Sequence, residues 1–408
     1  MSSDTIADQV VVPDHVPPDL VRRVDLISPG SGAACPYARL SALTEGPRVI
    51  FNPPEFFSPS GSWMLTRAED IRVVLQQPEI FSSVGIAGFS RILGEAWPLI
   101  PLELDPPEHP KFRAILNGIF APKKIAAMED GVRARAAALI DAVVDKGQCE
   151  FVEAFGRPFP VSIFMQLMGL PDRDASLLNG WEYDLLHSRE IEQRVRGAKG
   201  FYDYLKALIA KRRDEPADDL TTFVVQAQVD GRLLSDDEAM GVCFLLVVAG
   251  LDTVAASLGL HFRHLAMHPE HQARLRADPS LIPSAVEEFL RRYGIVSTSR
   301  FVTQETQVAG VQMKVGDRVS VLTQLASLDP DEFPDPLEVD IERAPNRHVA
   351  FSFGPHRCIG SHLARRELTI AIEEWLKRVT PFRIAAGVEV PVQPGGLLSV
   401  AELPLVWD

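Results

Sequence analysis

A run of thirteen consecutive apolar or glycine residues, 239–251, constrains the fold of this chain more than any other feature. Ser235, followed three residues later by a glutamate, has the form of a capping box at the start of a helix, and a proline shortly after Met267 marks its end. We therefore predict one long helix over residues 235–267. Because a membrane span needs about twenty apolar residues and Asp252 interrupts the run, we expect this helix to lie buried through the centre of a globular protein.

Composition and charge narrow the class of protein. The chain has 408 residues, 46% hydrophobic and 24% charged, so it can bury a large core, and disordered, collagen-like and coiled-coil classes are excluded. Its formal charge of −14 excludes a general attraction for nucleic acid, which depends on clustered Lys and Arg. The four cysteines have no metal-site spacing, and no secretory leader is recognisable. We expect a soluble protein of the bacterial cytoplasm, without a membrane or nucleic-acid partner.

The 32 prolines are spread along the chain and form no linker, which favours a single large domain, and hydrophobic periodicity indicates that it is mainly α with a smaller β-rich portion. Residues 48–66 contain short β-compatible runs around a Ser/Gly/Pro turn, which predicts a hairpin. Helical spacing dominates residues 111–292, and β signals return at 303–321 and 397–407. We divide the chain 1–408 into a β-rich N-terminal portion (about 45–70), a helical body (about 105–295) and a mixed region with a cysteine loop (about 296–408).

The cysteine loop has the sequence FSFGPHRCIG, residues 351–360, and a helix is expected to follow it from residue 361 to 376. A thiol at the start of a helix meets backbone N–H groups and the positive end of the helix dipole, both of which favour the thiolate. A lone cysteine is usually just a small buried hydrophobe. Two glycines and a proline around Cys358 nevertheless indicate that the loop presents the sulfur to a ligand.

Three other motifs are pairs of polar residues: Asp252 with Thr253, Glu288 with Arg291, and His109 with Arg113. The first pair is costly in an apolar helix unless it is hydrogen-bonded or used, although a hydroxyl bonded one turn back would satisfy the threonine. The second has the spacing of an ordinary surface ion pair. The third could bind an anion or simply face solvent. Singly, each pair is better explained by a structural role than by a functional one.

In this order and at these separations, the motifs resemble those of the cytochrome P-450 haem-thiolate monooxygenases over nearly the whole chain. The specific marker F-x-x-G-x-x-x-C-x-G is matched by Phe351, Gly354, Cys358 and Gly360. The patterns A-G-x-D-T, E-x-x-R and H-x-x-x-R match the three pairs. The sequence is most similar to the bacterial camphor 5-monooxygenase group, through residues 104–108, 250–254 and 403–408.

The resemblance implies a cytochrome P-450 fold with a long central helix over haem b, and it implies a role for each matching residue. Cys358 would be the thiolate ligand of the iron, which favours O–O cleavage. Four residues would bind the haem propionates: His109, Arg113, Arg300 and His356. Asp252 and Thr253 would be the acid–alcohol pair that supplies protons in a dry pocket. A buried ionic cluster supporting the cysteine loop would consist of Glu288, Arg291 and Arg343.

The same resemblance predicts the lining of the substrate pocket: Trp97, Leu99, Leu102, Leu245, Val248, Ala249, Val296, Thr298 and Leu397. This wall is almost wholly apolar, as expected for a small hydrocarbon-like ligand. The wall differs from that of the camphor enzymes at three positions. Trp97 replaces a ketone-binding tyrosine, Thr298 replaces an aspartate, and Gly88 stands near the position of a phenylalanine. We expect hydroxylation of another compact terpenoid: a monoterpenoid (cineole- or camphor-like) or a norisoprenoid.

No flavin or Fe–S segment is recognisable, so the resemblance implies that electrons reach the haem from a [2Fe–2S] ferredoxin and its NADH-dependent reductase, with O₂ as co-substrate. Basic residues gather around the motifs of the cysteine side: Lys111, Arg113, Lys123, Lys124, Arg357, Arg365 and Arg366. Such a face could steer an acidic partner, or several of these residues could bind only propionate or solvent.

Two other activities remain open at this point. A haem-thiolate peroxygenase or isomerase would need no redox partner, but such enzymes commonly lose the alcohol that Thr253 provides. A haem-binding protein without turnover would share every motif. Product formation with NADH, ferredoxin and reductase separates that protein from a monooxygenase.

Overall fold

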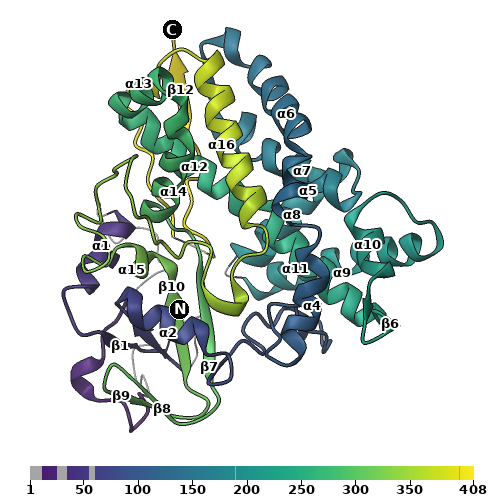
Figure 1. Ribbon diagram of the computed structural model, residues 1–408, viewed down its shortest axis with the longest axis vertical. Helices are drawn as coiled ribbons and strands as arrows, with labels where there is room; N and C mark the ends of the chain where they lie inside the picture. The colour runs from purple at the N-terminus through teal and green to yellow at the C-terminus, as the bar shows by residue number, and fades with distance from the viewer. Residues whose placement is uncertain (1–11, 25–34, 55–59, 189, 395) are drawn as a thin grey trace, which may run out of the picture.

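Helices make up most of the computed structural model, which describes residues 12–24, 35–54, 60–188, 190–394 and 396–408 (Figure 1). The helices up to the central pair are α1 (Pro36–Leu43), α2 (Ala68–Gln76), α3 (Phe89–Ile92), α4 (Glu108–Asn117), α5 (Pro122–Ala126), α6 (Glu129–Asp141), α7 (Pro158–Met168), α8 (Ala175–Leu186), α9 (Ile191–Asp214) and α10 (Leu220–Gln226). The others are α11 (Asp236–Leu251), α12 (Thr253–Met267), α13 (Pro269–Ala277), α14 (Ile282–Arg292), α15 (Thr323–Ser327) and α16 (Ser361–Arg378). The prediction of a mainly α fold is confirmed.

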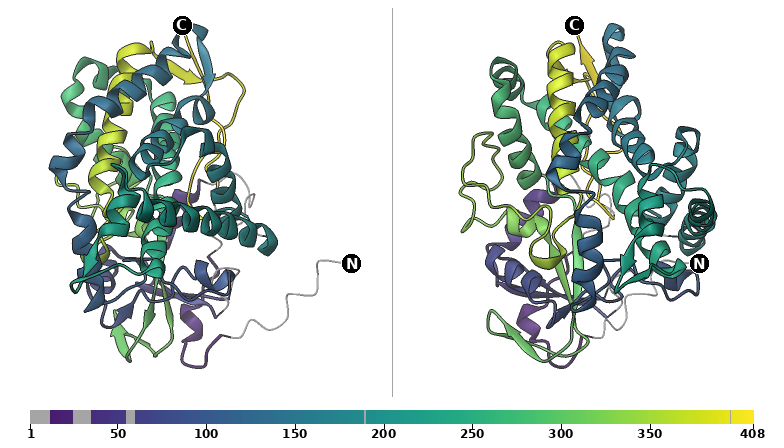
Figure 2. Two further views of the ribbon diagram at one scale, coloured as in Figure 1. Left: turned by 90° about the vertical axis from the view of Figure 1, so that its right-hand side faces the viewer. Right: turned by 45° about the vertical axis from the view of Figure 1, so that its right-hand side comes forward.

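The strands form one larger sheet and three small ones. Five strands pair in the order β1 (Val49–Asn52), β2 (Ser62–Leu65), β10 (Arg318–Leu322), β7 (Ser297–Val302) and β3 (Phe81–Ser82). The smaller sheets consist of β11 (Phe382–Ile384) with β12 (Pro404–Trp407) and β4 (Gln148–Glu150), β5 (Gln228–Val229) with β6 (Arg232–Leu233), and β8 (Thr306–Val308) with β9 (Val311–Met313). The five-stranded sheet lies at the end of the molecule opposite the C-terminus, and helices fill the other end (Figure 2).

The predicted N-terminal hairpin is present, with β1 and β2 paired antiparallel in the register Val49 to Leu65. Residues 55–59 of its turn lie outside the described residues. Parallel pairing of β10 with β2, and antiparallel pairing of β10 with β7, joins this hairpin to a segment more than two hundred residues later in the chain. The β-rich regions that stand far apart in the sequence therefore form one sheet.

The central helix begins as predicted but is not continuous. The side chain of Ser235 accepts a hydrogen bond from the Glu238 amide at 3.2 Å, while the Glu238 carboxylate accepts one from the Ser235 amide at 2.7 Å, which completes the capping box. The single helix expected over residues 235–267 instead breaks at Asp252 into α11 and α12. The Thr253 hydroxyl donates to the Ala249 carbonyl oxygen at 2.9 Å, and such side-chain bonds compete with the helical ladder and bend helices.

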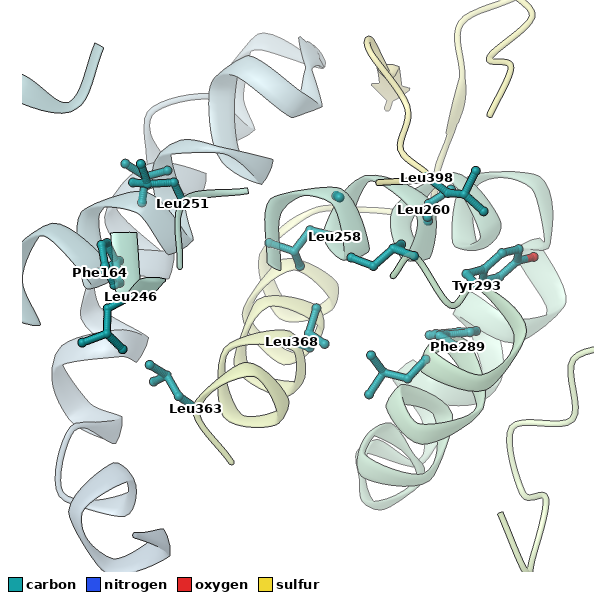
Figure 3. Packing of buried hydrophobic residues seen from close by; sticks show 14 of the residues in the cluster. Phe164, Leu246, Leu251, Leu258, Leu260, Phe289, Tyr293, Leu363, Leu368 and Leu398 are labelled. Carbon is teal, nitrogen blue, oxygen red and sulfur yellow. The ribbon is translucent and has the colours of Figure 1, made fainter. Parts of the chain in front are cut away.

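A close approach from α7 acts on the same turn. A Cβ atom on Gly250 would lie 2.4 Å from the Phe164 ring, so only glycine allows α7 to pack this tightly against α11. Figure 3 shows Phe164 beside Leu246 and Leu251 at this crossing. The glycine that weakens the helix is therefore also the residue that lets its neighbour approach.

By length and apolar composition, residues 236–267 are long enough to cross a membrane, and this is the one such segment in the described part of the chain. Within the protein, 67% of its most apolar window is buried. Aromatic rings complete the cover of α12: Phe262 stacks on Phe151 at 4.3 Å between ring centroids and meets the edge of Trp375 on α16 at 5.4 Å. The segment is therefore buried by other parts of the chain, as the core helix of a globular protein is.

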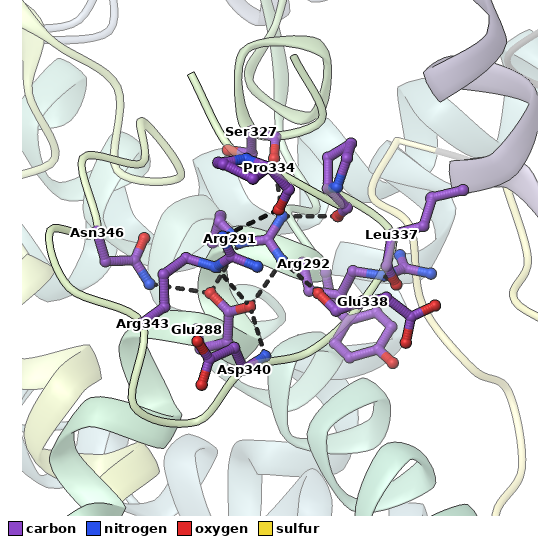
Figure 4. Close-up of polar contacts among 12 residues, drawn as sticks. Glu288, Arg291, Arg292, Ser327, Pro334, Leu337, Glu338, Asp340, Arg343 and Asn346 are labelled. Atoms are coloured by element: carbon purple, nitrogen blue, oxygen red, sulfur yellow. Dashed lines mark hydrogen bonds and ion pairs between the residues drawn. The ribbon is translucent and has the colours of Figure 1, made fainter. Parts of the chain in front are cut away.

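Glu288 and Arg291 on α14 are completely buried, and their polar atoms have partners (Figure 4). The guanidinium of Arg291 uses all five N–H groups, two on the Glu288 carboxylate at 2.7 Å and three on the carbonyl oxygens of Ser327, Pro336 and Glu338 at 2.7–2.9 Å. A planar fork of five donors is what makes arginine suited to such a site.

The Glu288 carboxylate also binds the segment that leads to the cysteine loop. It accepts hydrogen bonds from the Asp340 amide at 3.0 Å, the Arg343 guanidinium at 3.1 Å and the Asn346 side chain at 3.0 Å. One buried ionic cluster therefore joins α14 to the irregular stretch 327–346, just ahead of residues 351–360. We infer that it fixes the position of that loop.

We predict that Glu288→Gln destabilises the protein by roughly 3–5 kcal/mol, because it leaves Arg291 and Arg343 without a counter-charge in the interior. The matched control is Glu342→Gln, which breaks an exposed ion pair with Arg274 and should cost about 1 kcal/mol or less. Urea unfolding followed by tryptophan fluorescence measures both. Equal shifts in the two unfolding midpoints would contradict a structural role for the cluster.

Candidate functional site

One face of α11 is open although the helix lies in the core. Leu245, Val248 and Ala249 are partly or fully exposed, as are the two residues after the helix, Asp252 and Thr253. Their spacing, i, i+3, i+4, i+7 and i+8, is that of a single helical face. The side chains of Leu246, Val247 and Leu251, which lie between them, are buried, as is Phe244 just before them. A single accessible face on a helix that is otherwise covered borders an internal space.

Several other residues that the resemblance predicts to line the pocket are partly exposed, and two of them are paired. A β-bridge pairs Val296 with Leu397, which are a hundred residues apart in the chain. Leu102, Val296, Thr298 and Leu397 are all partly exposed. The Thr298 hydroxyl oxygen lies 3.3 Å from Nη1 of Arg300, which donates to it. These residues form walls of the kind expected for an apolar ligand.

Two predicted lining residues differ from the rest because they are almost fully buried. Leu99 is 1% exposed and Trp97 is 3% exposed. The Trp97 ring packs on Phe244 at 5.0 Å and parallel to Tyr202 at 6.2 Å between centroids. Its indole N–H has no hydrogen-bond partner among the described residues. A buried donor without a partner is rare, and a ligand with an oxygen acceptor would satisfy it.

The cysteine loop packs against α2. Gly354 has φ +69°, and a Cβ atom there would lie 2.4 Å from the Leu75 carbonyl oxygen, so the loop requires glycine at this point. The Cys358 amide donates to the Phe351 carbonyl oxygen at 2.8 Å, which closes the loop directly before α16. Figure 3 shows Leu363, in the first turn of α16, near Leu246 of α11.

The Cys358 thiol is accessible although protein surrounds the loop, so it too faces an internal space. The prediction that its position favours the thiolate is only partly right. Burial raises the pKa of this thiol, and the Gly360 amide together with Arg113, Arg365 and Arg357 lowers it less than burial raises it. Coordination of a metal ion stabilises the thiolate form of such a cysteine.

Four cationic or donor residues meet beside this space: His109, Arg113, Arg300 and His356. The imidazoles of His109 and His356 lie 4.2 Å apart between centroids, and His109 Nε2 is buried without a partner among the described residues. Burial, followed by the neighbouring cations, lowers the pKa of His356 to about 3. Burial lowers the pKa of Arg300 to about 10. It also lowers the pKa values of Arg113 and His109.

No ion pair within the described residues neutralises these four groups. The acid whose charge acts on His109 and Arg300 is Asp105, and its carboxylate already accepts hydrogen bonds from the Ser82 hydroxyl and the Ser83 amide. Arg113 and Arg300 stay charged, and burying a cation without an anion is costly, because its desolvation is not repaid. The cluster therefore fits a ligand that carries carboxylates, such as the two propionates of a haem whose iron faces Cys358.

The sequence did not reveal the partners of Asp252. Its carboxylate lies 2.9 Å from His187 Nε2, and Glu182 lies 3.4 Å from the same nitrogen. Burial acts to lower the pKa of His187, but hydrogen bonds to Asp252 and Glu182 outweigh it and raise the pKa to about 10. His187 is therefore a cation at neutral pH. No local motif could predict this contact, since it joins residues 65 positions apart.

The basic residues of the cysteine side fall into two groups. Lys111 binds Glu108 and Asp230, Arg365 binds Glu287, and Arg366 binds Glu129, so their charges are compensated. The exposed side chains of Lys123 and Lys124 on α5 and of Arg357 form no ion pair within the described part of the chain. Since α5 packs against α16, these three form the basic patch of the cysteine side.

A separate groove of about 730 Å³ is lined mainly by α6, α7 and α10. It includes none of the predicted lining residues and none of the four propionate-binding candidates. We infer that the functional site lies instead between the open face of α11 and the cysteine loop.

Comparison with known proteins gives one family. The model described as Cytochrome P450 matches residues 176–396. The chain is 42% identical to Probable cytochrome P450 127A1 of Sinorhizobium fredii, over 97% of each chain. It is 31% identical to Steroid C26-monooxygenase of Mycolicibacterium smegmatis, over 87% of this chain and 90% of that one. The crystal structure of Cytochrome P450 CYP101C1 matches with a TM-score of 0.86 at 34% identity, covering 98% of this chain and 100% of the other.

Identity of this size across almost the full length of both chains exceeds what a shared fold alone would require. The resemblance first read from the cysteine loop and the three motif pairs is thereby confirmed, together with the haem b cofactor that members of the family bind. The chain belongs to the cytochrome P450 family of monooxygenases.

Proposed function

We propose that this monooxygenase hydroxylates a small apolar terpenoid at an unactivated C–H bond, using O₂ and electrons from a [2Fe–2S] ferredoxin with an NADH-dependent reductase, in the bacterial cytoplasm. The observation that carries the proposal is the open apolar face of α11, which ends in Asp252 and Thr253. A substrate on that face would lie between apolar side chains and the proton-handling pair.

The haem would be held by residues of this chain at two places. Cys358 would ligate the iron, and His109, Arg113, Arg300 and His356 would bind the propionates, which supply the anions that these four groups lack. When bound, haem b supplies the iron at which dioxygen is activated, and thiolate ligation favours O–O cleavage. The buried ionic cluster of Glu288, Arg291 and Arg343 would hold the ligand loop in place.

Asp252 and Thr253 would move protons in this site. Because the Thr253 hydroxyl donates to the Ala249 carbonyl, its oxygen lone pairs remain to accept a hydrogen bond on the open side. The cationic His187 lies 2.9 Å from the Asp252 side chain and fixes its position beside Thr253. The apolar walls exclude other proton donors, so that protons pass through this pair.

The lining supports a compact apolar substrate with at most one polar fixing group. Leu245, Val248 and Ala249 offer only alkyl surface, and the unpartnered Trp97 N–H would donate to an ether, hydroxyl or carbonyl oxygen if the substrate reaches it. One relative is named for a steroid. A test of the substrate class must therefore include steroids as well as terpenoids.

We expect the ferric protein to shift from low to high spin when one compact terpenoid displaces water from the iron. Titration followed at the Soret band, with monoterpenoids, norisoprenoids and steroids, measures this. Val248→Phe should weaken the best ligand by about tenfold or more, because overpacking costs about 1–3 kcal/mol. Val73→Phe, on an exposed position of α2, should not. A shift with steroids alone, or with no compound, would overturn the terpenoid assignment.

We predict that Thr253→Ala uncouples NADH use from hydroxylation, with product per NADH falling by about a factor of ten or more, since a positioned proton-transfer group is lost. Thr253→Ser should restore most of the coupling. Ser257→Ala is the control. It removes a hydroxyl one turn later that donates in the same way to a backbone carbonyl oxygen, that of Thr253 at 3.0 Å. Full coupling in Thr253→Ala would contradict the proton role.

We predict that the double change Lys123→Glu and Lys124→Glu slows reduction by the ferredoxin by about tenfold at low ionic strength, because the basic patch steers an acidic partner. The effect should shrink as salt is added. Stopped-flow reduction under CO measures the rate. The control, Lys206→Glu with Lys211→Glu on α9, makes the same change in net charge elsewhere. An equal loss in both variants would remove this patch as the docking site.

A further inference from the structure

Four of the ten histidines of the chain stand within residues 261–271, far from the haem-binding motifs in sequence. Three of them meet where α12 ends and α13 begins: His264 in the last turn of α12, His268 between the helices and His271 in the first turn of α13. One ring nitrogen of each lies within 4.8 Å of one ring nitrogen of both others. This side-chain cluster has no part in the proposed monooxygenase site.

The three rings already lie near the spacing of a tetrahedral site. His264 Nε2 and His271 Nδ1 are 2.8 Å apart, and two ligand nitrogens on a tetrahedral Zn²⁺ are about 3.3 Å apart, given Zn–N bonds of about 2.0–2.1 Å. The ring of His268 stacks on that of His264, with centroids 4.2 Å apart. His268 is 42% exposed, so its ring can tilt to direct a nitrogen at the ion. Small side-chain rotations would therefore complete the site.

Two of the rings have the outer partners that metal-binding histidines usually have. The Tyr293 hydroxyl lies 2.7 Å from His264 Nδ1, and the Glu270 carboxylate lies 2.9 Å from His268 Nδ1. If each Nδ1–H donates to its oxygen partner, the Nε2 lone pair of each ring is left for a metal. Figure 3 shows Tyr293 at the end of α14, beside α12. The second partner is exposed, which gives an ion a route from solvent.

The charge state of the cluster also suits a cation. Burial, followed by His268 and His271, lowers the pKa of His264 to about 2, and burial lowers that of His271. Both rings are therefore neutral at pH 7, as metal ligation requires. The charged groups that face them are Glu270 and Asp340, which favour a cation, and Arg274 and Arg292, which oppose it. The four formal charges cancel.

We propose that His264, His268 and His271 form a site for a divalent first-row transition metal ion, with Zn²⁺ as the expected occupant. Three imidazoles suit this class of ion rather than Mg²⁺ or Ca²⁺, which prefer oxygen ligands. Without metal, one of His264 and His271 donates to the other. Binding requires His271 to carry its proton on Nε2, so no net proton is released. The remaining coordination position is open to water.

The surrounding structure makes the site rigid and gives it a structural role. The buried Gln272 side chain donates to the carbonyl oxygens of Leu265 and Phe382 at 2.7 Å and accepts from the Phe382 amide at 3.2 Å, which ties the corner to β11. A metal bound here would join α12 and α13 covalently and would act on α14 through Tyr293. We therefore expect binding to raise the melting temperature of the folded protein.

The test uses the haem-containing protein purified without a histidine tag. Equilibrium dialysis against Zn²⁺ with metal analysis should give one equivalent bound, with micromolar or tighter affinity. His268→Gln and His271→Gln, which change partly exposed residues and should fold, should each weaken binding by about tenfold or more. Tyr293→Phe keeps all three ligands and should weaken binding by about ten- to a hundredfold through loss of the outer partner. His362→Gln, an exposed histidine outside the cluster, is the control.

Zinc should also raise the melting temperature of the wild type and of His362→Gln but not of His271→Gln. Less than half an equivalent bound at saturating zinc would overturn the proposal, as would equal affinity in His271→Gln and the wild type. In either case the cluster would be a hydrogen-bonded histidine group that only fills the corner. Ferric and ferrous–CO spectra of each variant check that the haem site is intact, so failure here is distinguishable from failure of the monooxygenase assignment.

Discussion

An apolar helix that has to be covered on nearly every side determines how the rest of this protein is arranged. α11 is enclosed by α7, α8, α9 and α10, and its continuation α12 packs through Phe262 against Phe151 and Trp375. The cover is complete except along one face. That exception leaves one accessible strip of side chains along the helix, and the break at Asp252 puts the polar residues of the helix at the end of this strip.

Two groups of buried charges differ in a way that separates structural roles from ligand binding. Around Glu288 and Arg291 every donor of the guanidinium has a partner, so the cluster is complete in the protein alone. Arg113 and Arg300, in contrast, form no ion pair among the described residues, and the buried His109 Nε2 beside them has no hydrogen-bond partner there. Since both groups are deeply buried, the difference lies only in the missing anion. The first group is explained by packing, and the second is explained by a ligand with two carboxylates.

Local patterns in the sequence were sufficient for the capping box at Ser235, the β1–β2 hairpin and the start of α16 after the cysteine loop. Each depends on residues that are neighbours in the chain. The break in the central helix was not predicted, because it also depends on the approach of Phe164 to Gly250. Nor was the contact of His187 with Asp252, since only the tertiary fold brings them together. The raised pKa of the Cys358 thiol has the same origin: burial outweighed the helix start that the sequence shows.

The open face of α11 has a consequence for how this enzyme can change over evolutionary time. Its lining positions recur every third or fourth residue, while the residues between them, such as Phe244 and Val247, belong to the core. Further lining positions come from separate segments that each contribute one or two side chains, as Val296 and Leu397 do across their bridge. Selection can thus alter the shape of the cavity one side chain at a time while the packing of the scaffold stays as it is, so that new substrates become accessible without a new fold.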